Sequence, residues 1–192
     1  MIWAVLELPG SDVAERLAAS LGVGVASDLV PGTHLIHLGD DASLARVCDE
    51  VGPDTPILHH PIGASDVGRM FGERDVAVQI EHGSVYPIEL IEVRSDRGRY
   101  VAAGHAVASA SGRLPGPMAR NRQIEIRRDG RDHIADGAAI VFANCQHVAG
   151  FTVAPRAALM DGRFDLQVIG GTPIDRLRRR RAMRRGLHLA SR

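Results

Sequence analysis

The chain has 192 residues, of which 45% are hydrophobic, so it can form one large or two small folded domains and is too apolar to be disordered. Its 23 acidic residues balance 23 basic residues, and this neutral total argues against a general nucleic-acid binder. Every basic residue other than histidine is arginine, so any phosphate contact must use arginine, backbone N–H groups or a metal.

The two cysteines, Cys48 and Cys145, lie far apart and form no CxxC pair, so neither a zinc ribbon nor a redox pair is expected. The first residues have no basic segment before their apolar run, which argues against a signal peptide. No apolar run reaches the length of a membrane span. We therefore expect a cytoplasmic protein without a transmembrane segment.

Residues 1–78 alternate short apolar runs with amphipathic segments. The predicted strands are residues 2–8, 33–38 and 56–58, and the predicted helices are residues 13–21, 43–51 and 66–71. This alternation is typical of an α/β layer with a parallel sheet. Because ligands of such sheets bind beyond the carboxyl ends of the strands, the segments that follow the second and third strands are the expected ligand edge.

Residues 79–171 change to short alternating runs and predict a mainly antiparallel β second domain. The predicted strands are residues 85–93, 100–108, 123–128, 139–142, 151–153 and 164–168. Asp-Gly turn signals at residues 129–130 and 161–162 separate some of them.

Residues 172–192 predict a basic helix with Thr172 as its cap and seven arginines between Arg176 and Arg185. We expect Ile174, Leu177 and Met183 to be its buried side chains. The arginines form either a solvated face or a surface that binds anionic lipid.

Gly39 and Asp40 follow the second predicted strand, and Asp41 and Ser43 come next, where a helix begins. Glycine lets backbone N–H groups approach a phosphate, and a helix N-terminus favours an anion. A carboxylate there can hold a metal-nucleotide or the reacting hydroxyl. The alternative is that Asp40 and Asp41 only cap the helix.

The third predicted strand is followed by Pro61, Gly63, Ser65, Asp66 and Arg69. The segment has the composition of a loop that leads into a helix N-terminus and could line a phosphate path. Its alternative interpretation is an ordinary turn and helix cap.

A third motif lies within residues 140–169. Its residues are Asn144, Gly150, Ala154, Pro155, Ala157, Asp161, Gly162 and Asp165. On spacing alone, they predict a β-meander with two tight turns.

Together, and in this order, the three motifs resemble those of the diacylglycerol kinase and sphingosine kinase family of lipid kinases. The first resembles the Gly-Gly-Asp-Gly-Thr loop that this family shares with NAD kinases, with Leu38 and Asp41 in place of two glycines. The second resembles Pro-Leu-Gly-Thr-x-Asn-Asp, with its threonine missing and Ser65 in place of asparagine. The third resembles the Asn-Gly, Ala-Pro-x-Ala and Asp-Asp-Gly pattern, with Met160 in place of the first aspartate.

The resemblance implies an NAD kinase/diacylglycerol kinase-like fold and transfer of the γ-phosphate of ATP, with Mg²⁺, to a lipid hydroxyl such as that of diacylglycerol at a membrane surface. It implies Asp40 as the catalytic residue, and Asp161 as the metal ligand or as a residue that shapes the second domain. The implied nucleotide-binding residues are Gly39, Asp40, Ser43, Gly63, Ser65 and Asp66. The family's Asp-Gly-Glu motif, with the expected general base, does not occur in the sequence. An inactive pseudokinase or binding module with the same fold is therefore the alternative.

Four histidines lie on or next to predicted strands: His34, His37, His59 and His60. Within each strand, the two side chains point to opposite faces of the sheet. We interpret them as packing or loop histidines and not as metal ligands.

Overall fold

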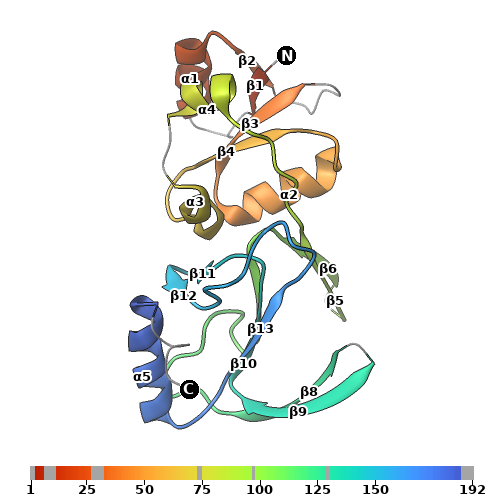
Figure 1. The fold of residues 1–192 in the computed structure, drawn as a ribbon, viewed down its shortest axis with the longest axis vertical. Coiled ribbons are helices and arrows are strands. Elements are labelled where there is room, and N and C mark those ends of the chain that lie inside the picture. The colour runs from red at the N-terminus through yellow and green to blue at the C-terminus, as the bar shows by residue number, and fades with distance from the viewer. Residues whose placement is uncertain are drawn as a thin grey trace. The chain divides into compact units, whose positions relative to one another are not determined.

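The computed structural model describes residues 3–6, 12–26, 33–72, 75–96, 98–128 and 130–186. The chain divides into two compact units, Met1–Ala103 and Gly104–Arg192 (Figure 1). The predicted boundary between residues 78 and 79 lies within the first unit. The ends of the predicted strand at residues 2–8 and the first residue of the 129–130 turn lie outside the described residues.

The first unit contains a four-stranded parallel sheet, as the α/β pattern predicted. Its strands are β1 (Trp3–Leu6), β2 (Gly24–Ala26), β3 (His34–Gly39) and β4 (Ile57–Pro61), in the order β2-β1-β3-β4. The sequence pattern did not predict β2, because a strand of three residues, Gly24, Val25 and Ala26, is too short to show hydrophobic alternation.

Four helices accompany this sheet: α1 (Val13–Leu21), α2 (Asp41–Val51), α3 (Asp66–Phe71) and α4 (Val76–His82). The first three were predicted from apolar spacing and caps, whereas α4 was missed. Buried side chains of β1, β3, α1 and α4 form one core cluster, and they are Val5, Ile36, Leu38, Ala14, Ala18 and Val76.

The first unit also includes a hairpin of β5 (Ile91–Ser95) and β6 (Gly98–Ala102). Arg99 of β6 binds both carboxylate oxygens of Asp49 on α2 at 2.7 Å. The single strand predicted over residues 100–108 is wrong, since Ala103 and Gly104 separate β6 from β7 (His105–Ser109).

The second unit is mainly antiparallel β, as predicted. Its central sheet has the order β13 (Asp165–Ile169), β10 (Ala139–Ala143), β7. Two hairpins join it: β8 (Arg122–Arg128) with β9 (Arg131–Gly137), and β11 (His147–Val148) with β12 (Phe151–Thr152).

Helix α5 (Pro173–Arg184) packs beside β12 (Figure 1). Thr172 and Asp175 form the capping box that begins it. The expected buried side is wrong in part: Met183 is buried, but Ile174 is 62% exposed and Leu177 is 40% exposed. Arg176, which was expected with the other arginines on a solvated or lipid-binding face, is buried with Met183 instead. No helix among the described residues is long and apolar enough to cross a membrane.

Candidate functional site

The candidate site lies at the carboxyl ends of β3 and β4. Gly39 and Pro61 are register partners at the ends of these strands, and the Ile62 N–H donates to the Gly39 carbonyl at 3.1 Å. This pairing brings the Gly39–Asp40 loop next to the loop that contains Gly63 and Ser65. The two segments predicted as the ligand edge are therefore neighbours.

Gly39 is required by its own surroundings. Its φ is +151°, and a Cβ there would lie 2.5 Å from Ser43 Oγ and 3.2 Å from the His37 ring. Gly63 also has a positive φ, +88°, but a Cβ there would meet nothing within 4 Å. A glycine is therefore needed at position 39 for packing, independently of any contact with a ligand.

Asp40 is exposed and caps α2. Its Oδ1 accepts from the Ser43 N–H at 2.8 Å, and the Ser43 hydroxyl lies 2.9 Å from the Asp40 carbonyl oxygen. The Ser43 hydrogen bond holds the pKa of Asp40 below its ordinary value. Its carboxylate is therefore negative at neutral pH and reachable from solvent.

Asp41 caps the neighbouring helix and not its own. Its Oδ2 accepts from the N–H groups of Asp66 at 2.7 Å and Val67 at 3.3 Å, both in the first turn of α3. Its Oδ1 accepts a short hydrogen bond from the Ser65 hydroxyl. The prediction that both aspartates cap one helix is therefore wrong for Asp41, because its acceptors reach a segment 24 to 26 residues away. The backbone N–H groups at the start of α3 are therefore already hydrogen-bonded to a carboxylate of the protein itself.

His37 and His59 connect the two loops through their side-chain contacts. They are direct register partners on adjacent parallel strands, so their side chains lie on the same face. Their Nδ1 atoms are 3.0 Å apart and their rings stack, with centroids separated by 5.1 Å. His37 Nε2 lies 3.1 Å from Ser43 Oγ, and His59 Nε2 lies 3.1 Å from Ser65 Oγ.

These contacts define one hydrogen-bonded chain. Burial, followed by repulsion from His59, lowers the pKa of His37 to about 4, and burial also lowers the pKa of His59. Both rings are thus neutral at pH 7, and one Nδ1 must donate to the other. Because the Ser65 hydroxyl donates its proton to Asp41, His59 Nε2–H donates to Ser65 and His37 Nδ1–H donates to His59. The one proton of the Ser43 hydroxyl then lies between two acceptors, His37 Nε2 at 3.1 Å and the Asp40 carbonyl oxygen at 2.9 Å.

The sequence pattern did not predict this network of hydrogen bonds, because the histidines within one strand point to opposite faces and the partner of each lies on the neighbouring strand. The matching position of the two histidines emerges only from the observed strand ends, since the predicted third strand stopped at residue 58. His37 and His59 each lie two residues before the last residue of their strand. In successive parallel strands, equal positions predict neighbours on one face.

Ser65 and Asp66 are both buried at the N-terminus of α3, and Ser65 Oγ accepts from the Gly68 N–H at 2.7 Å. Asp161 lies in the second unit, where its Oδ1 accepts from the Arg163 N–H at 3.1 Å. The described residues contain no group of three or more His, Cys, Asp or Glu side chains placed to hold a metal ion.

No protein-family model matches the sequence, and no curated protein matches it. Among solved structures, the chain is similar to a diacylglycerol kinase from Bacillus anthracis str. Sterne, with a TM-score of 0.60 and 13% identity. The match covers 100% of this chain and 78% of that chain. At this identity the similarity defines the fold, which is the two-domain diacylglycerol kinase-like fold that the motifs predicted.

Proposed function

We propose that this chain is a lipid-kinase-like protein that transfers the γ-phosphate of ATP to a lipid hydroxyl such as that of diacylglycerol. The observation that carries the proposal is the position of Asp40: an exposed, ionised carboxylate at the carboxyl end of a parallel strand in a diacylglycerol kinase-like fold. Such a group can orient the reacting hydroxyl or hold the metal-nucleotide.

The residues at this edge fit a metal-nucleotide better than they fit a metal alone. Proteins usually hold Mg²⁺ through one or two carboxylates together with substrate phosphates, and Asp40 supplies such a carboxylate. When bound, the ion would neutralise phosphate charge. Gly39, Ser43 and Gly63 are the proposed nucleotide contacts beside Asp40, and Asp161 is the proposed metal ligand of the second unit.

Ser65 and Asp66 fit a phosphate less well. The Ser65 hydroxyl and the backbone N–H of Asp66 both donate to Asp41, so a phosphate would have to displace that carboxylate. This observation favours a second candidate function, a binding module that keeps the fold without turnover. In both cases we propose a lipid partner and a peripheral location at the cytoplasmic side of a membrane.

The test is phosphatidate formation from ATP, Mg²⁺ and diacylglycerol in mixed micelles, with ATP binding measured by calorimetry. Asp40→Asn is the informative variant, because asparagine caps a helix as well as aspartate does but carries no charge. We expect Asp40→Asn to lower turnover by about 100-fold or more. Asp75→Asn is the matched control, since Asp75 is another exposed aspartate that caps a helix, α4.

Full activity in Asp40→Asn would exclude Asp40 from the reaction. ATP binding without product from any lipid hydroxyl would favour the binding module. The absence of both product and ATP binding would contradict the kinase-like proposal.

A further inference from the structure

One face of the second unit combines exposed aliphatic side chains with arginines. We call it the α5 outer face and define it by Met118, Ile174, Leu177, Arg178, Arg181 and Arg185. Met118 is the most exposed of its apolar members, at 82%. Helical periodicity explains the arrangement on α5: Arg176 and Met183, seven residues apart, face inward, so Ile174, Arg178 and Arg181 face outward.

Arg176 fixes the loop that presents Met118. Its guanidinium donates to the Pro117 carbonyl from Nε at 3.0 Å and from one Nη at 2.7 Å, and it also donates to the Ala119 carbonyl. A second Nη donates to Asn121 Oδ1 at 2.7 Å. The carbonyls on both sides of Met118 are thus held by one buried cation, and the Met118 side chain is presented to solvent from a fixed backbone.

Leu177 and Pro117 line the same shallow hollow. Arg181 and Arg184 also border this hollow, so Pro117, the residue before Met118, adjoins α5 on this surface. Arg180 and Arg184 are placed by Phe151, with their guanidinium carbons 4.8 and 5.4 Å from the ring centroid. Arg180 and Arg184 are therefore held in place next to Leu177.

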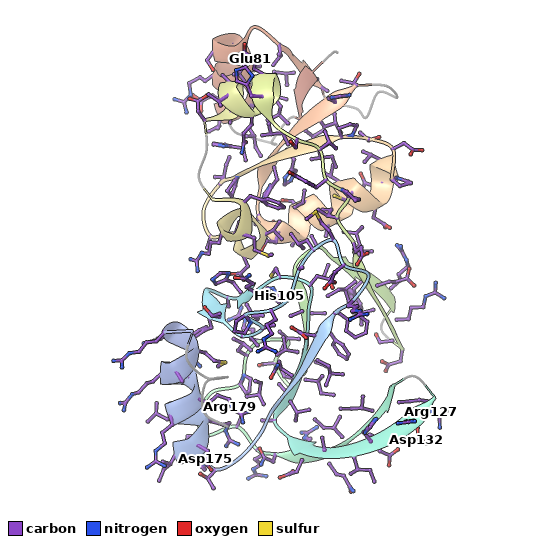
Figure 2. All side chains as sticks on the ribbon, viewed as in Figure 1. Glu81, His105, Arg127, Asp132, Asp175 and Arg179 are labelled. Atoms are coloured by element: carbon purple, nitrogen blue, oxygen red, sulfur yellow. The ribbon has the colours of Figure 1, made fainter. Side chains whose placement is uncertain are left out.

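The arginines of this face carry charge that is compensated only in part: the pKa of Asp175 is lowered chiefly by its hydrogen bonds with Thr172 and also by the charge of Arg178. The one acidic residue of α5, Asp175, bonds to Thr172 in the capping box, at the end where α5 begins (Figure 2). Within the described part of the chain, no carboxylate lies within ion-pair distance of Arg178, Arg181 or Arg185. By contrast, Arg127 on the β8–β9 hairpin pairs with Asp132 at 2.7 Å (Figure 2).

We propose that the α5 outer face docks on an anionic lipid surface, with Met118, Ile174 and Leu177 entering the boundary between headgroups and acyl chains. Arg178, Arg181 and Arg185 contact the lipid phosphates. A helix with a basic face and exposed apolar side chains is the form that lies in a membrane interface. Charge complementarity alone would also fit nucleic acid, but single-stranded nucleic acid binds through aromatic stacking, and the apolar members of this face are aliphatic.

The proposal rests on the lipid-kinase-like function for its biological purpose, but its test needs no ATP. Binding of the full chain to vesicles of phosphatidylcholine with phosphatidylglycerol is compared with binding to pure phosphatidylcholine. We expect binding to the anionic vesicles alone, and weaker binding as salt rises. Chloride and inorganic phosphate at equal ionic strength should weaken it equally, because the surface binds lipid and not free phosphate.

Two double variants separate charge from insertion. Arg178→Gln with Arg181→Gln should lower partitioning about 25-fold, or about fivefold for each arginine. Met118→Ser with Leu177→Ser should lower it several-fold at constant charge. The matched control is Arg127→Gln with Arg131→Gln, which removes the same charge from the β8–β9 hairpin and should leave partitioning unchanged.

Equal binding to neutral vesicles would overturn the proposal, as would an equal loss in the hairpin control. Binding to single-stranded RNA that is tighter than vesicle binding and insensitive to Met118→Ser with Leu177→Ser would assign the face to nucleic acid instead. Vesicle binding without kinase activity would refute the catalytic proposal alone, and kinase activity without vesicle binding would refute this one alone.

Discussion

Replacing Asp41 tests the hydrogen-bonded chain between the two loops. Asp41→Ala removes the acceptor of two α3 amides and of the Ser65 hydroxyl, and through Ser65 it disturbs the contacts of His59 and His37. Loss of a helix cap costs about 0.5–2 kcal/mol. An unsatisfied buried donor costs about 1–3 kcal/mol more. We therefore expect the free energy of unfolding to fall by about 1.5–5 kcal/mol.

Asp75→Ala provides the reference for the cap alone. Asp75 accepts from two backbone N–H groups of α4, at 2.8 and 3.2 Å, as Asp41 does on α3, but among the residues that the structure describes its carboxylate joins no side-chain network. Urea unfolding monitored by circular dichroism gives both free energies. The difference between the two losses of unfolding free energy measures the contribution of the side-chain hydrogen bonds that run from Ser65 through His59 and His37 to Ser43. Equal losses in Asp41→Ala and Asp75→Ala would refute the argument that these side chains act as a connected network.

Two further outcomes concern the same site, and a third concerns Arg176 in the second unit. The pKa of His37 is lowered in the folded state, so as the pH falls the unfolded chain binds a proton at this histidine before the folded chain does. The free energy of unfolding should therefore be highest above pH 6.5 and fall by up to about 3 kcal/mol as the pH drops to about 4. Urea titrations should show a weaker pH dependence for His37→Asn. Gly39→Ala should lower the free energy of unfolding by about 1–3 kcal/mol, because of the positive φ of Gly39 and the nearby Ser43 hydroxyl. Gly63→Ala should lower it less, because Gly63 has a positive φ but a Cβ there would meet no neighbouring atom within 4 Å. Equal losses of stability in thermal melts would contradict this steric explanation. Arg176→Met should lower the free energy of unfolding by about 2–4 kcal/mol, because several carbonyls lose a charged donor, and an unchanged melting temperature would exclude this role.

Local pattern was sufficient for the parts of the fold that depend on neighbours in sequence. The alternation of strands and helices predicted the parallel sheet, and Ser65 and Thr172 were recognised as caps because a cap bonds within three residues. The motif order predicted the diacylglycerol kinase-like fold, which the structural similarity confirms. The roles of Asp40 and the other proposed site residues stay predictions.

Tertiary structure alone decided which side chains meet. His37 contacts His59 because two strands 22 residues apart pair in register, and Asp41 caps α3 because the ends of β3 and β4 are adjacent. Arg176 is buried, and Leu177 exposed, because the carbonyls that Arg176 binds lie 57 to 59 residues away. Helical spacing identifies which residues share a face, but the partner across the fold determines which face turns inward.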